Sequence, residues 1–123
     1  MALDLTSLTK AIDALDRSLA ATADGLSSIP PNLRDTVRAI LAAHLPEATV
    51  FVFGSRARGT ARLHSDLDLA VAADAPLPLD RLEALRDAFA ASDLPMQVDV
   101  VDYRAASAGF RRIIDANKVP LAR

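Results

Sequence analysis

Apolar residues recur along this chain in two periods, one typical of helices and one typical of strands. Spacings of three and four residues, which bring apolar side chains onto one face of a helix, recur in four stretches. Short apolar runs rich in valine and phenylalanine are typical of strands. The helical stretches are 6–22, 33–44, 80–91 and 105–116, and the strand-like stretches are 49–53, 66–71 and 96–101.

The order of these elements predicts an α+β fold (of the α/β type) with a small sheet. The connection between the first two strands is too short for an ordinary crossover helix, so a purely parallel sheet is not expected. We expect a mixed sheet of three or four strands flanked by helices, in which residues 119–121 are a short edge segment or a tail.

Two helices are expected to begin at capping boxes, in which a polar N-cap residue is followed three residues later by an acid. Asn32 and Asp35 form this pattern before one helix, and Asp80 and Glu83 form it before another.

The first helical stretch carries a narrow apolar stripe, and Gly25 is its expected end. Such a stripe suits packing on the chain's own domain, and it also suits a seam with a second subunit or a partner. We therefore expect an N-terminal helix and linker over 1–30 and a single domain over 31–123. The stripe is Leu8, Ile12, Leu15 and Leu19.

Composition narrows the classes of function. The 123 residues are 51% apolar with a net charge of −2, which indicates a globular chain and argues against binding nucleic acid by charge alone. Cysteine is absent, which excludes disulfides, zinc–thiolate sites and thiol nucleophiles. The first residues show neither the basic region nor the apolar core of a signal peptide, and no apolar run reaches the ~18 residues that a membrane span needs, so we expect neither feature. We expect a cytoplasmic protein.

Two acids in the second strand are the strongest chemical signal. Asp66 and Asp68 lie two residues apart in an apolar run, so their side chains face the same side of a strand. Asp99, in the third strand, would join them if the two strands are neighbours. Three carboxylates in one pocket suit two Mg²⁺ or Mn²⁺ ions and in-line phosphoryl or nucleotidyl transfer.

Two alternatives to this interpretation stay open. Asp102 competes with Asp99 as the third acid, although the alternation of the third strand favours Asp99. A carboxylate pair also serves glycoside hydrolysis, but a sugar cleft is lined with aromatic side chains, and this chain has one Tyr and no Trp.

A glycine–serine turn follows the first strand. Gly54 permits a sharp turn and the close approach of a ligand, and Ser55 can open a short helix whose first N–H groups attract phosphate. Arg56, Arg58 and Arg62 then supply positive charge for a polyphosphate. Each piece alone is typical of an ordinary turn or a solvated face. The turn, the later D-x-D and the acid in another strand are together much more specific.

The segment FGSRARGTARLHSDLDLAV, with the later MQVDVV, resembles the minimal nucleotidyltransferases (MNT domains) of the DNA polymerase beta-like superfamily, over about residues 33–115. The resemblance implies that Gly54 and Ser55 grip a nucleotide triphosphate. It also implies that Arg56, followed by Arg58, contacts phosphate.

The same resemblance implies roles for the acids. Asp66 and Asp68 would bind two metal ions, Mg²⁺ or Mn²⁺, and Asp99 would hold the catalytic metal and help to activate the incoming hydroxyl. ATP would be the substrate. No part of the motif is missing, so the resemblance implies an active enzyme.

The resemblance also implies a partner. Family members of this size are typically encoded beside a small helical HEPN protein, which is a toxic ribonuclease. They act as antitoxins by transferring AMP from ATP to a tyrosine of that toxin. Independently, the sheet and its helices leave no residues for an acceptor-binding domain.

Two other functions stay open at this point. An antitoxin can neutralise its partner by complex formation with little catalysis. A small-molecule nucleotidyltransferase can form its acceptor site across a homodimer.

Overall fold

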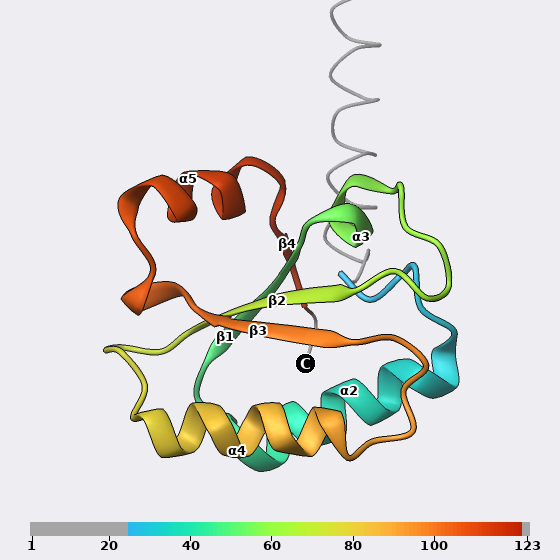
Figure 1. Ribbon diagram of the computed structural model, residues 1–123, viewed down its shortest axis with the longest axis horizontal. Helices are drawn as coiled ribbons and strands as arrows, with labels where there is room; N and C mark the ends of the chain where they lie inside the picture. The colour runs from blue at the N-terminus through green and yellow to red at the C-terminus, as the bar shows by residue number, and fades with distance from the viewer. Residues whose placement is uncertain (1–24, 122–123) are drawn as a thin grey trace, which may run out of the picture.

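A four-stranded mixed sheet with helices on both faces makes up the protein, in a computed structural model that describes residues 25–121 (Figure 1). The helix expected over 6–22 lies outside the described residues. The elements are α2 (Pro31–His44), β1 (Thr49–Phe53), α3 (Ser55–Arg58), β2 (Leu67–Ala72), α4 (Leu79–Ala90), β3 (Val98–Asp102), the 3-10 helix η1 (Tyr103–Ala105), α5 (Ala108–Asn117) and β4 (Val119–Pro120).

The strands lie in the order β3-β2-β1-β4. β1 is antiparallel to both β2 and β4, whereas β2 and β3 run parallel. The mixed sheet predicted from the short β1–β2 connection is confirmed, and the tail after α5 supplies the edge strand β4. Within residues 25–121, no helix is both long and apolar enough to cross a membrane.

Alternation along β1 assigns the helices to their faces of the sheet. Val50 and Val52 belong to the core beneath α2 and α4, whereas Phe51 and Phe53 face α5 (Figure 1). The larger core includes several fully buried side chains, among them Leu41, Leu45, Val52, Leu69 and Leu85.

The opposite face carries a much smaller apolar cluster. Phe53, Ala70 and Ile114 are buried there, and the ring of Phe110 meets that of Phe53 edge-on, with 6.0 Å between centroids. Because this cluster is small, α5 covers only part of its face and leaves room for polar side chains at one end of the sheet.

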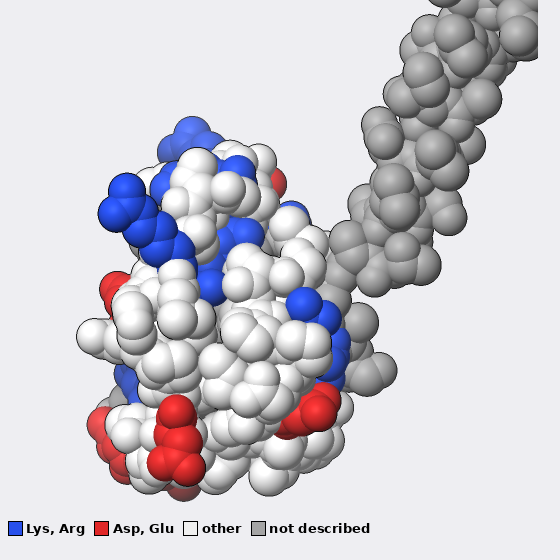
Figure 2. Space-filling view, turned by 90° about the vertical axis from the view of Figure 1, so that its right-hand side faces the viewer, with Lys and Arg blue, Asp and Glu red and all other residues white. Residues whose placement is uncertain are grey.

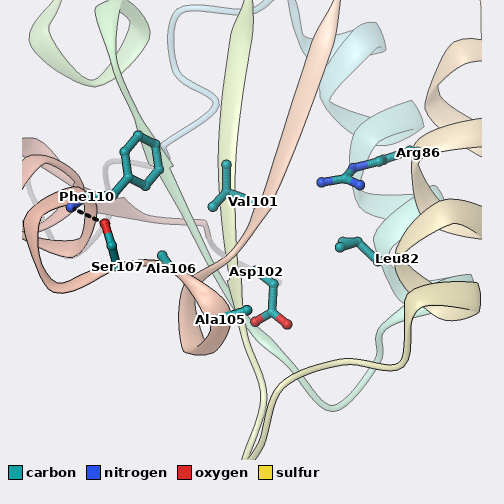
Figure 3. A pocket seen from close by; sticks show the side chains of 8 residues that line it. All are labelled: Leu82, Arg86, Val101, Asp102, Ala105, Ala106, Ser107 and Phe110. Carbon is teal, nitrogen blue, oxygen red and sulfur yellow. Dashed lines mark hydrogen bonds between the residues drawn. The ribbon is translucent and has the colours of Figure 1, made fainter.

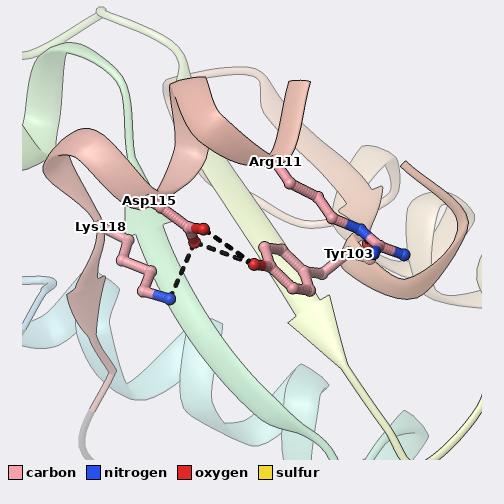
Figure 4. A network of polar contacts seen from close by, with 4 residues as sticks. All are labelled: Tyr103, Arg111, Asp115 and Lys118. Carbon is pink, nitrogen blue, oxygen red and sulfur yellow. Dashed lines mark hydrogen bonds and ion pairs between the residues drawn. The ribbon is translucent and has the colours of Figure 1, made fainter. Parts of the chain in front are cut away.

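A polar network also fastens α5 (Figure 4). The Tyr103 hydroxyl donates to both carboxylate oxygens of Asp115 at 3.0 Å, and the Lys118 ammonium pairs with the same carboxylate at 2.9 Å. The Lys118 bond, together with the Tyr103 hydroxyl, holds the pKa of Asp115 below its usual range. The last turn of α5 is thus tied to η1 through Tyr103 and to Lys118, the residue before β4.

Both expected capping boxes are wrong. α2 begins at Pro31, so Asn32 lies inside its first turn, and α4 begins at Leu79, so Asp80 does likewise. In both helices a proline stands at the N-cap and makes no side-chain cap bond. The fixed φ of proline pre-sets the start of α2, and Asp80 still interacts favourably with the dipole of α4.

α5 begins at Ala108, later than the expected start at residue 105, because Ser107 caps it. The Ser107 hydroxyl accepts a hydrogen bond from the backbone N–H of Phe110 at 3.1 Å. The residues before it form η1 instead.

Candidate active site

Two of the predicted acids face each other across neighbouring strands. Asp68 in β2 and Asp99 in β3 are register partners in the parallel pair, so their side chains project from the same face of the sheet. Both are half-buried. The second and third strands are thus neighbours, which is the condition on which Asp99 was expected to join the other acids.

The electrostatics of the pair favour a cation. Burial, and then the negative charges of Asp99 and Asp66, raise the pKa of Asp68 above its ordinary value of 3.8, and the Arg58 charge acts the other way. The Asp99 side chain is also in hydrogen-bonding contact with that of Asp68. A bound positive charge would relieve the repulsion between these carboxylates. Carboxylate oxygens are also the ligands that hard divalent cations prefer.

Asp66, the third predicted acid, lies two residues before Asp68 in the chain. It is the exposed residue immediately before β2, and its charge still acts on Asp68. Among residues 25–121, no three His, Cys, Asp or Glu side chains form a ready-made metal cluster. The two facing carboxylates of Asp68 and Asp99 are donors that fit a divalent cation, and the charge of Asp66 acts on the same Asp68.

The glycine–serine turn adjoins the acids. Gly54 has φ 71° and ψ −152°, a backbone conformation that is open essentially to glycine alone. A Cβ atom on Gly54 would collide with the Oδ2 atom of Asp68. The turn and the acid pair are therefore one packed unit, and Ser55 begins α3 immediately beside it.

The two arginines expected to bind the nucleotide have different surroundings. Arg58 is exposed, and its charge reaches Asp68. Arg56 is only 5% exposed, and its guanidinium donates to the backbone carbonyls of Arg62, Leu63 and Ser65 and to Ser28. In this arrangement Arg58 is the better placed of the two for a phosphate.

Asp102, the competing acid, has a structural use. Its Oδ1 atom accepts from the N–H of Arg104 at 3.0 Å and its Oδ2 atom accepts from the N–H of Leu77 at 2.8 Å, so it caps η1 and holds the loop before α4. It also lines a cavity of about 470 Å³ between α4 and α5 (Figure 3). Neither Asp68 nor Asp99 lines that cavity, so Asp102 lies apart from the acid pair. Asp99, the register partner of Asp68, is therefore the better candidate for the third acid.

One residue of the site was missed in the sequence. The side-chain amide of Gln97 donates to the Oδ1 atom of Asp99 at 3.0 Å, which orients that carboxylate. The signal was present, because residues two apart in an extended chain share a face.

Charge is unevenly spread over this end of the molecule. Figure 2 views the end of the sheet that lies at the right in Figure 1. Blue Lys and Arg side chains lie mainly in the upper half and centre of this view, on the α3 and α5 side of the sheet. Red Asp and Glu side chains lie mainly below, over the α2 and α4 side. An anionic ligand is thus attracted to the side of the sheet on which α3 and the acid pair lie.

Comparisons with known proteins agree with this geometry. Residues 35–122 match the family described as Polymerase beta, Nucleotidyltransferase. A Haemophilus influenzae protein named "Probable protein adenylyltransferase MntA" is 45% identical over 78 residues, which cover 63% of this chain and 68% of the relative.

Solved structures share the fold. The chain superposes on a toxin–antitoxin with AMP-PNP with a TM-score of 0.61 and 29% identity, over 72% of each chain. A protein assigned as a minimal nucleotidyltransferase gives a TM-score of 0.56 and 33% identity, over 73% of this chain and 93% of its own. The chain therefore belongs to the polymerase beta nucleotidyltransferase family, as an MntA-like minimal nucleotidyltransferase.

Proposed function

We propose that this protein is an antitoxin that transfers AMP from ATP to a hydroxyl group, that of a tyrosine, on a partner HEPN toxin. The observation that carries the proposal is the pair of register-matched carboxylates, Asp68 and Asp99, packed against Gly54. A phosphate-binding turn in contact with two facing acids is what nucleotidyl transfer needs, and a purely structural domain has no use for it.

The residues take the following roles. The Gly54-Ser55 turn and the exposed Arg58 would bind the triphosphate. Asp66, Asp68 and Asp99 would hold two Mg²⁺ ions (or Mn²⁺), which neutralise the triphosphate and the departing pyrophosphate.

The transfer is balanced without a further reactant. The acceptor oxygen bonds to the α-phosphorus of ATP, and the bond from that phosphorus to the β-phosphate bridging oxygen breaks. Pyrophosphate leaves, and Asp99 helps to activate the hydroxyl by accepting its proton. Because ATP and Mg²⁺ are abundant in the cytoplasm, the reaction would take place there.

Two observations support a protein acceptor. The described residues form one sheet with its helices and include no separate acceptor-binding domain, which supports an acceptor presented by another chain. The related Haemophilus protein bears the name of a protein adenylyltransferase, and a related structure is that of a toxin–antitoxin with AMP-PNP.

A turnover test separates catalysis from simple neutralisation. The HEPN protein of the proposed pair is incubated with ATP, Mg²⁺ and about one-tenth as much of this protein. Catalysis predicts complete loss of ribonuclease activity, because one molecule modifies many. Asp66→Asn with Asp68→Asn should abolish the loss, and Asp87→Asn, an exposed acid on α4, should not change it.

Two outcomes would contradict the proposal. If the doubly altered protein still neutralises fully, and only at equal amounts, complex formation is the mechanism. If AMP leaves on a small molecule while the partner stays unmodified, the protein is a small-molecule nucleotidyltransferase.

A further inference from the structure

The guanidinium of Arg56 is a buried charge balanced by neutral groups. Its residue is 5% exposed, and within residues 25–121 no carboxylate forms an ion pair with it. Burial accordingly lowers the pKa of Arg56. A buried cation without a counter-ion is costly unless hydrogen bonds replace its water, so its acceptors show what it is for.

Those acceptors belong to two segments that the sequence keeps far apart. The Nη2 atom donates to the carbonyl of Arg62 at 3.0 Å and to the carbonyls of Leu63 and Ser65 at 2.8 Å, all in the loop before β2. The Nη1 atom donates to the hydroxyl of Ser28 at 3.2 Å and to its carbonyl at 3.4 Å. Arg56 thus ties α3 to the loop and to the chain before α2.

The Ser65 carbonyl is the most informative of these acceptors. It receives two bonds from Arg56, from Nε at 3.2 Å and from Nη2 at 2.8 Å. This oxygen lies in the same planar peptide unit as the backbone nitrogen of Asp66, so fixing it orients the backbone from which the Asp66 side chain projects. At its other end, Arg56 follows Ser55 directly in α3.

We propose that Arg56 is a positioning residue, which locks the backbone of Asp66 at a fixed place relative to Ser55. It sets the separation between the turn that binds phosphate and the acids that bind metal, and it does so without touching the nucleotide. This inference rests on the proposed function and adds a residue to it.

Arginine is required for this task, and lysine is not an adequate substitute. The planar guanidinium presents five donors in a rigid fork, and Arg56 directs them at acceptors on two sides. An ammonium group keeps the charge and loses the fork. Arg56→Lys therefore tests geometry at constant charge, and the loss of a phosphate contact in the same variant would appear as a raised KM for ATP.

The first readout is hydrogen exchange of the metal-free protein, which needs no catalysis. In Arg56→Lys, we expect amides of residues 59–66 to exchange at least about tenfold faster, because the loop loses the donors that close it. Ser28→Ala, which removes one hydroxyl acceptor, should give a smaller increase. The matched control is Arg58→Lys, the exposed arginine of the same helix, which should leave exchange of the loop unchanged.

The second readout is Mg²⁺ dependence. Loss of a group that orients a metal ligand typically weakens metal affinity about 10- to 100-fold, so Arg56→Lys should raise the Mg²⁺ concentration for half-maximal transfer by at least about tenfold. At saturating Mg²⁺, its KM for ATP should change less than twofold and most of kcat should return. Arg58→Lys should do the reverse, raising the KM for ATP with little change in Mg²⁺ dependence.

The results separate the ideas. Unchanged loop exchange together with a raised KM for ATP in Arg56→Lys would overturn the inference and make Arg56 a phosphate ligand. Unchanged exchange and unchanged Mg²⁺ dependence would overturn it as well. If the wild-type protein transfers no AMP, the proposed function fails, and the exchange comparison still decides whether Arg56 locks the loop.

Discussion

The carboxylate of Asp68 packs against the residue of the turn that has no side chain. Gly54 is held at φ 71°, and its missing Cβ leaves the space that the Oδ2 atom of Asp68 takes up. The same carboxyl group is raised in pKa by burial and by its acidic neighbours. At the residue scale, the site is thus a pair of crowded acids, and a bound cation would relieve the repulsion between them.

Gly54→Ala should lose binding of Mg²⁺–ATP as well as stability. The added methyl group has to displace Asp68, and a non-glycine residue in this conformation costs roughly 1–3 kcal/mol. Gly59→Ala is the matched control, because Gly59 also has positive φ, at 76°, but a Cβ there meets nothing within 4 Å. Urea unfolding should show that both variants are destabilised, and a Mg²⁺–ATP titration should show that only Gly54→Ala has lost binding. Equal binding by the two variants would contradict the account.

Asp68→Asn should stabilise the metal-free protein at neutral pH. A carboxyl group whose pKa is raised on folding adds stability when protonated, below 3.8, and that stability is lost as pH rises through the folded pKa. The neutral amide avoids this loss, so its Tm should exceed that of the wild type by a few degrees at pH 7 and approach it in acid.

Excess Mg²⁺ should reverse that order, because only the wild type gains stability from the ion. A Tm of Asp68→Asn at or below that of the metal-free wild type at pH 7 would show that the acid pair is not under strain.

At the scale of elements, the starts of the helices were the hardest feature to predict. Asn32 fits the N-cap pattern by residue type, yet the prolines before it begin α2 earlier. Ser107 was not singled out, and its hydroxyl caps α5. Cap patterns are short and compete with neighbouring prolines, so the residue type alone does not decide which position is the boundary.

Ser107→Ala and Asn32→Ala test this difference directly. Ser107→Ala removes a cap bond and should cost ~1 kcal/mol in the free energy of unfolding. Asn32→Ala removes no cap, because Asn32 is exposed within the first turn, and should stay within about 0.5 kcal/mol. Urea denaturation measures both. A larger loss in Asn32→Ala would restore the predicted capping box.

What could be predicted depended on periodicity and on chemistry that is local in the chain. The strands and the mixed sheet followed from alternation and from the short β1–β2 connection, whereas the convergence of Asp68 with Asp99 depended on the pairing of β2 with β3, which the sequence left open. The surroundings of Arg56 could not be predicted, because they depend on Ser28, which only the folded chain brings near. Gln97 was within reach of the same-face rule and was overlooked.

At the scale of the whole molecule, the described residues include the candidate groups for the nucleotide but no site for the acceptor. The acids, the turn and the exposed arginine lie on the α3 and α5 side of the sheet, where positive charge gathers (Figure 2). The described residues form one sheet with its helices, and the acceptor that we propose belongs to another chain. The central test is therefore whether the partner chain receives AMP.

The intact mass of the HEPN partner after incubation with this protein, ATP and Mg²⁺ tests this claim most directly. The account predicts a gain of whole AMP units on the partner, lost when its acceptor tyrosine is replaced by phenylalanine. Asp68→Asn with Asp99→Asn should abolish the gain, whereas Asp87→Asn on α4 should retain it. An unmodified partner with the wild-type protein, or an equal gain with the doubly altered one, would contradict it.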